Sequence, residues 1–219
     1  MITQELLFPT PVWWQDFELD ANKLTTICHH VRDEYGGQIR SNVGGYQSND
    51  FNGAHLLTVD DELGKLANRL TEMASEIYAR FEPQGTHVEL ANLWININNG
   101  SDYNVTHTHP GSVISGAYYV TAPEDAGKIV FVRDHSTSFN FSSVGTMQDF
   151  ALGEGEPWLW NQFSYPPMVN RCIMFPAWLP HKVEASETQS ERISISFNFV
   201  PVQTHDRISY GIVKKINEC

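Results

Sequence analysis

The strongest constraint on the fold is the stretch 191–200, in which apolar and polar residues alternate. Successive side chains of a β-strand point to opposite faces, so this stretch predicts a strand with one apolar and one polar face. The apolar face holds Ile193, Ile195, Phe197 and Phe199. A second stretch, 87–98, has a similar polar face with a tryptophan in it. Two polar faces can lie in solvent or can line one polar cavity inside a sandwich, and the pattern alone leaves both possibilities open.

Other segments complete this picture. Residues 6–17 contain two prolines and favour an edge strand. Asp20 can cap a helix that ends at Gly36-Gly37, and Asp60 can cap a longer helix over about 61–81. The remaining predicted strands are 113–120, 128–133, 171–175 and 181–184. Short strands that follow two helices predict a mainly β fold of the α+β class, a sandwich or barrel backed by helices.

The domain organisation is expected to be simple. We expect one domain over 1–219, with a helical and edge-strand elaboration at 1–85 and a catalytic core at 86–200. The segment 136–170 is aromatic and longer than a simple strand connection. It is expected to be an insertion that acts as a lid, or a structural excursion with its own hydrophobic cluster.

Composition excludes several classes of function. The formal net charge is −12, from 14 basic and 26 acidic residues, which argues against binding to nucleic acid or to an anionic membrane. Three scattered cysteines show no CxxC spacing, so we expect reduced thiols in a soluble, cytoplasmic protein. No apolar stretch approaches the about 18 residues of a membrane span. The N-terminal strand and helices offer a surface on which a homodimer could form.

Three histidines and an arginine form the candidate site. His107 and His109 are two residues apart, as two ligands on one strand face would be, and His181 can add a third imidazole from a distant strand. Arg192 and Ser194 share a strand face and can hold a carboxylate by charge-assisted hydrogen bonds. By contrast, His29 and His30 lie on the first predicted helix and are expected to be exposed.

Several runs together resemble a known family. The runs NVTHTHPGSVISGAYYV, FPAWLPHKV and ERISISFNF, with GGYQS upstream, are similar to the small phage and bacterial 2-oxoglutarate-Fe(II) oxygenases. The resemblance covers roughly residues 40–200. It implies a double-stranded β-helix, or jelly roll, with iron(II) at its mouth and 2-oxoglutarate as co-substrate.

The resemblance also implies roles for single residues. His107 and His181 take the two histidine positions of the metal triad, and His109 stands where the wider superfamily has Asp or Glu. Arg192, helped by Ser194, matches the residue that pairs with the distal carboxylate of 2-oxoglutarate. Tyr118 and Asn96 are implied as cavity-lining hydrogen-bond donors. The sequence departs from the superfamily at Met168-Val169-Asn170, where a turn glycine is usual, but asparagine tolerates the left-handed conformation.

Two other functions remain open at this level. A three-histidine metal face also suits a cupin-type dioxygenase or isomerase that uses no 2-oxoglutarate, in which Arg192 would bind the acid group of the substrate itself. A jelly roll can also be a non-catalytic binding module. On the leading reading, the prime substrate is a small molecule or a peptide, which is oxidised with release of succinate and CO₂.

Overall fold

The computed structural model describes residue 3, residues 8–133 and residues 160–203. The helices are α1 (Ala21–Glu34), α2 (Gly53–Leu56) and α3 (Glu62–Ala79). The strands before the histidine pair are β1 (Trp13–Asp16), β2 (Asn42–Val43), β3 (Tyr46–Gln47), β4 (Phe51–Asn52) and β5 (Thr86–Asn98). The later strands are β6 (Tyr103–His107), β7 (Ile114–Thr121), β8 (Ile129–Val132), β9 (Gln162–Tyr165), β10 (Arg171–Pro176), β11 (His181–Val183) and β12 (Arg192–Gln203).

The strands form two antiparallel sheets. The larger sheet has the order β1-β10-β7-β12-β5-β3, with β4 also paired to β5, and the smaller has the order β2-β6-β11-β8-β9. From β5 to β12 the chain passes back and forth between the sheets, and only β8 and β9 are consecutive in one sheet. This winding is the double-stranded β-helix, so the expected mainly β fold with packed helices is confirmed.

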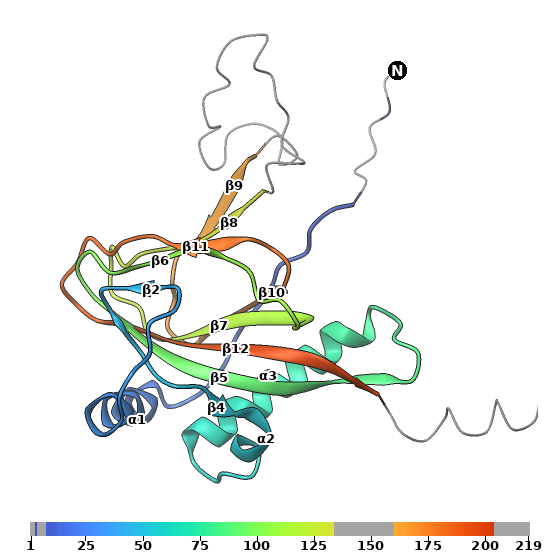
Figure 1. The fold of residues 1–219 in the computed structure, drawn as a ribbon, viewed down its shortest axis with the longest axis horizontal. Coiled ribbons are helices and arrows are strands. Elements are labelled where there is room, and N and C mark those ends of the chain that lie inside the picture. Colours follow the sequence, from blue (N-terminus) through green and yellow to red (C-terminus); the bar gives the residue numbers. More distant parts are fainter. Residues whose placement is uncertain (1–2, 4–7, 134–159, 204–219) are drawn as a thin grey trace, which may run out of the picture.

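The helices cover one side of the larger sheet, and the smaller sheet faces its other side (Figure 1). The main hydrophobic core lies under the helices and includes Leu24, Leu70, Ile95 and Phe197, all fully buried. A smaller aromatic cluster around Phe131 and Phe175 lies between the two sheets. Burial on both sides of the larger sheet therefore fixes which face of each central strand points into the sandwich.

The two predicted helices are confirmed with small changes at their ends. The Asp20 carboxylate accepts hydrogen bonds from the backbone N–H groups of Asn22 and Lys23, as a cap should. The predicted cap at Asp60 is wrong by one residue, because Asp61 accepts from the Gly64 N–H and precedes α3. The segment 6–17 contains β1, which is the edge strand of the larger sheet.

The strand prediction found β5, β7, β8, β10, β11 and β12. It missed β6, whose last residue is His107, and it missed β9. Of the predicted lid at 136–170, residues 136–159 lie outside the described part of the chain. Residues 162–165 form β9, which pairs with β8 in the smaller sheet and so belongs to the jelly roll. Among the described residues, no helix is long and apolar enough to cross a membrane.

Candidate metal centre and co-substrate cavity

Two of the three histidines lie opposite one another in the smaller sheet. His107 ends β6 and His181 begins β11, and the two are partners in the antiparallel register. His109 lies past the end of β6, where its backbone N–H donates to the Ala177 carbonyl at 2.9 Å. The spacing of two was expected to place His107 and His109 on one strand face. His109 instead lies beyond the strand, at the start of the turn that its carbonyl closes by accepting from the Ser112 N–H at 3.3 Å.

The imidazoles converge. One ring nitrogen from each of the three histidines lies within 4.8 Å of the other two. The Nδ1 atoms of His107 and His181 lie 2.7 and 2.9 Å from the carbonyls of Val105 and Leu179, so each Nδ1 carries the proton and each Nε2 keeps its lone pair. The Nε2 atoms of His109 and His181 are 3.3 Å apart. A cation between these nitrogens can therefore bind the lone pairs of His107 and His181, and that of His109 when the His109 proton lies on Nδ1.

Burial keeps these histidines neutral. It lowers the pKa of His107, and it lowers the pKa of His109 to about 4, with a smaller contribution from the nearby His107. Burial also lowers the pKa of His181 to about 3, again with His107 as the second cause. Neutral imidazole is the form that binds a metal, so at neutral pH the cluster needs to lose no proton before binding.

A small cavity of about 40 Å³ separates the two sheets beside the histidines. Apart from the three histidines, its polar lining consists of Ser41, Asn96, Asn104, Tyr119, Arg192, Ser194 and Ser196. Its apolar lining includes Trp94, Ile129, Phe175 and Val183. The polar faces of the two alternating strands thus line a cavity inside the sandwich and do not lie in solvent.

Arg192 is 3% exposed and is held by neutral groups. One guanidinium nitrogen donates to the Gly127 carbonyl at 2.8 Å, another donates to Asn98 Oδ1 at 3.1 Å, and Nε has no partner. Among the described residues, no carboxylate lies within 4.0 Å of the guanidinium. A buried guanidinium without a carboxylate is costly, and burial lowers the pKa of Arg192. An acid that enters the cavity would supply the missing partner.

A polar ladder leads from Arg192 toward the histidines. The register of β12 on β5 pairs Arg192 with Asn98, Ser194 with Asn96, and Ser196 with Trp94. The Trp94 ring lies 5.7 Å from the His109 ring, measured between centroids. Arg192, Ser194 and Ser196 are spaced by two residues on one strand face, so the ladder is about 13 Å long.

One predicted cavity residue is misplaced. Tyr118 packs in the core under the helices, where its hydroxyl donates to Asn170 Oδ1. Its neighbour Tyr119 points between the sheets and lines the cavity, and burial raises the pKa of Tyr119 to about 12. The pattern of 113–120 could not distinguish the two tyrosines, because this stretch is apolar on both faces. Asn96, Ser194 and Arg192 line the cavity.

Asn170 explains how the chain turns without the usual glycine. Its φ is +67°, which is the left-handed region that asparagine tolerates. Its side chain accepts from Tyr118 and donates to the Leu19 carbonyl at 3.3 Å. The turn at 168–170 therefore survives the departure from the superfamily, as predicted.

Comparison with known proteins finds one matching family model. Residues 92–198 match the family model described as "Putative 2OG-Fe(II) oxygenase". The matched span contains the three histidines, Arg192 and the whole polar ladder. No curated protein matches the chain.

Solved structures share the fold at low sequence identity. A prolyl-4-hydroxylase from Pseudomonas putida is 14% identical with a TM-score of 0.55, and the match covers 87% of this chain and 92% of that one. The carbocyclase SnoK of nogalamycin biosynthesis is 11% identical, with a TM-score of 0.59 and coverage of 94% and 86%. HygX from Streptomyces hygroscopicus, solved with nickel and 2-oxoglutarate, is 10% identical, with a TM-score of 0.54 and coverage of 87% and 83%. These likenesses show the double-stranded β-helix.

Proposed function

We propose that the protein is an Fe(II)- and 2-oxoglutarate-dependent dioxygenase, and the match of residues 92–198 to the 2OG-Fe(II) oxygenase family model supports this proposal. One observation carries the proposal. The same cavity is lined by three converging neutral imidazoles and by a buried guanidinium without a carboxylate partner. A divalent metal and an organic acid are the two ligands that these groups lack.

We propose His107, His109 and His181 as the iron ligands. Three imidazoles leave other coordination positions open, which a catalytic metal requires. His109 replaces the usual carboxylate, so the metal face carries no negative charge of its own and the centre keeps the +2 charge of iron(II). Dianionic 2-oxoglutarate would neutralise that charge, so this set of ligands fits the co-substrate.

The other half of the cavity suits the distal carboxylate of 2-oxoglutarate. Arg192 offers its unpartnered Nε, and Ser194 lies two residues along the same strand face. Asn96 Nδ2 donates to Ser196 Oγ at 3.1 Å, which leaves Asn96 Oδ1 unpartnered. Because a hydroxyl can also donate, the Asn96 amide can turn its N–H₂ group toward the cavity. Tyr119 is a further donor that the sequence did not identify.

Bound iron(II) with 2-oxoglutarate and dioxygen supplies an oxidant that removes hydrogen from a substrate, with release of succinate and CO₂. The chain's own part is to hold the ligands and to exclude water. The Phe175 ring lies 4.5 Å from the His181 ring and the Phe131 ring lies 6.3 Å from it, measured between centroids. These rings close the sheet interface behind the metal ligands, where water would otherwise quench the oxidant.

The prime substrate is proposed to be a small molecule or a peptide. The net charge of −12 supports a substrate other than nucleic acid. We also propose a cytoplasmic location, which is supported by the buried free thiols of Cys28 and Cys172. A homodimer through β1 and the helices is part of the same proposal.

Anaerobic titration tests the function. Adding iron(II) and then 2-oxoglutarate should produce a visible charge-transfer band with one equivalent of each, and admitting oxygen should form succinate. A protein that binds iron but gives neither the band nor succinate would instead be the three-histidine cupin-type enzyme. A protein that binds no iron would be a jelly-roll binding module.

A further inference from the structure

Arg192 depends on its backbone for its position. Within the described part of the chain, its guanidinium donates to a peptide carbonyl and an amide side chain and forms no ion pair that would fix the charge in place. The placement of the guanidinium therefore follows from where the strand holds the Arg192 backbone, and a displacement of about 1 Å is enough to weaken binding severely.

The strand is irregular at this point. Ile193 is opposite Thr121 and Ser194 is opposite Tyr119, so Val120 of β7 has no partner in β12. Such a bulge removes backbone partners from the facing strand. In an antiparallel sheet, successive residues of a strand direct their N–H and C=O groups to opposite neighbouring strands. The Glu191 carbonyl and the Ile193 N–H, on either side of Arg192, both point toward β7.

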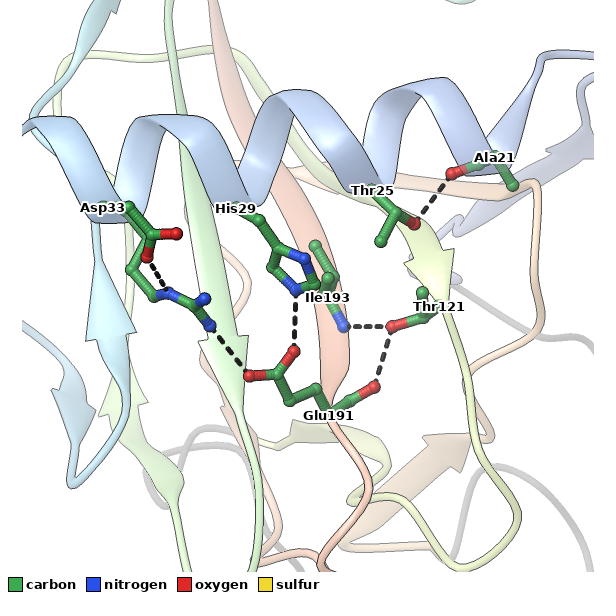
Figure 2. Close-up of polar contacts among 8 residues, drawn as sticks. Ala21, Thr25, His29, Asp33, Thr121, Glu191 and Ile193 are labelled. Atoms are coloured by element: carbon green, nitrogen blue, oxygen red, sulfur yellow. Dashed lines mark hydrogen bonds and ion pairs between the residues drawn. The ribbon is translucent and has the colours of Figure 1, made fainter.

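At the bulge, the Thr121 hydroxyl replaces the missing backbone hydrogen-bond partners of β12. Thr121 Oγ1 donates to the Glu191 carbonyl at 2.8 Å and accepts from the Ile193 N–H at 2.8 Å. One side-chain oxygen thereby fixes the residue before Arg192 and the residue after it (Figure 2). On the other side, β5 pairs Asn98 with Arg192.

Helix α1 holds Glu191, the residue before Arg192, from outside the sheet. His29 Nε2 lies 2.7 Å from one carboxylate oxygen of Glu191 (Figure 2). An Arg32 guanidinium nitrogen donates to the other carboxylate oxygen at 2.9 Å. His29 and Arg32 are three residues apart, so they lie on one face of the helix. His29 was expected to be exposed, but it is only partly exposed and contacts Glu191, which lies 162 residues further along the chain.

We propose that Thr121, together with the His29 and Arg32 contacts to Glu191, is the positioning element that sets Arg192 for the distal carboxylate of the co-substrate. The inference rests on the proposed function and deepens it. Thr121 and Glu191 do not line the cavity, and they act through Arg192. A positioning role predicts an effect that depends on the distal carboxylate, which a general loss of stability would not produce.

The test compares Thr121→Val with Thr121→Ser, and uses two 2-oxo acids. Binding of 2-oxoglutarate to the anaerobic Fe(II) protein is measured by its charge-transfer band and by calorimetry, and so is binding of 2-oxobutanoate, which lacks the distal carboxylate. Valine keeps the shape of threonine without the hydroxyl and should raise the 2-oxoglutarate Kd about tenfold. Serine restores the hydroxyl and should return the Kd to within about threefold of the original.

Controls separate positioning from stability. Thr25→Val on α1 also removes one half-buried hydroxyl bond, to the Ala21 carbonyl, and should leave both affinities unchanged. Thr121→Val should leave the affinities for iron(II) and 2-oxobutanoate unchanged. Glu191→Gln weakens both contacts to α1 and should raise the 2-oxoglutarate Kd about threefold. If Thr121→Val does not fold, Glu191→Gln carries the test alone.

Unchanged 2-oxoglutarate affinity in these variants, or equal weakening for both acids, would overturn the inference. Failure of the proposed function looks different. In that case the unaltered protein with iron bound would not bind 2-oxoglutarate at all, and the positioning role would fall with it.

Discussion

The metal end and the anchor end of the cavity are built in different ways. At the metal end, a strand end, a turn and a strand start each supply one histidine, and the rings touch one another. At the anchor end, Arg192 begins β12 opposite Asn98 of β5, and its guanidinium donates to the Asn98 side chain and to the Gly127 carbonyl. Thr121 bonds to the residues on either side of Arg192. A bound cation would complete the proposed metal end, whereas protein contacts already hold the anchor end in place.

This difference has a consequence for mutations. Removal of one histidine should abolish metal binding, because no other described side chain can replace the lost ligand. Changes around Arg192 should weaken co-substrate binding in steps, because several contacts share its positioning. The two ends should therefore respond separately, with iron affinity as the readout of one and 2-oxoglutarate affinity as the readout of the other.

The largest expected effect is at the metal end. His181→Ala should lower bound iron from one equivalent to below about a tenth and abolish succinate formation, because loss of a metal ligand costs more than the 10–100-fold of an outer contact. Metal analysis after anaerobic reconstitution measures this. His87→Ala is the control, since His87 pairs with Glu89 on the surface. Retention of a full equivalent of iron by His181→Ala would disprove the triad.

The next largest effect is the loss of 2-oxoglutarate binding at the anchor end, without a change at the metal end. Arg192→Met should raise the 2-oxoglutarate Kd about 100-fold, because the distal carboxylate loses its charged partner. Iron affinity should not change. Arg171→Met is the matched control, because Arg171 pairs with Asp16 at the sheet edge and lies over Trp14, away from the cavity. A parallel loss of iron in Arg192→Met would show that the two ends are not separate.

A smaller effect sharpens the placement of the two tyrosines. Tyr119→Phe should weaken 2-oxoglutarate binding about fivefold, because a donor in the cavity is lost. Tyr118→Phe should leave that affinity unchanged and lower the free energy of unfolding by about 1 kcal/mol, because the hydrogen bond to Asn170 is lost. Titration and chemical denaturation measure the two quantities. Weaker 2-oxoglutarate binding in Tyr118→Phe and unchanged binding in Tyr119→Phe would show that Tyr118 lines the cavity.

The smallest expected effect is the pH dependence of stability that arises from protonation of the histidines. The pKa values of His109 and His181 are lowered from 6.5 to about 4 and about 3, so below pH 6.5 the unfolded chain binds more protons than the folded one. The stability of the metal-free protein should therefore be complete above pH 6.5 and fall as the pH drops toward 3. Denaturant midpoints across this range measure the loss. A flat profile would place the imidazoles in solvent.

Parts of this design were predictable from local pattern. Alternation along 87–98 and 191–200 gave the two central strands and their faces, because a half-apolar strand has only one stable orientation on a core. Asp20 and Asn170 were predictable because a helix cap and a left-handed turn need particular residue types. Tyr118 was misassigned because 113–120 is apolar on both faces, so the period of two carries no information there.

The sequence by itself determined the ligand types, the strand periodicity and the residue that could bind an acid. Only the tertiary structure decided that the polar faces turn inward, that His109 reaches the other histidines from a turn, and that Thr121 and α1 hold the backbone beside Arg192. The physical reason is the separation along the chain of the residues that interact. Local patterns report the two faces of one strand. Convergence, burial and the surroundings of Arg192, which among the described residues include no carboxylate within 4.0 Å, arise from contacts between residues far apart in the chain.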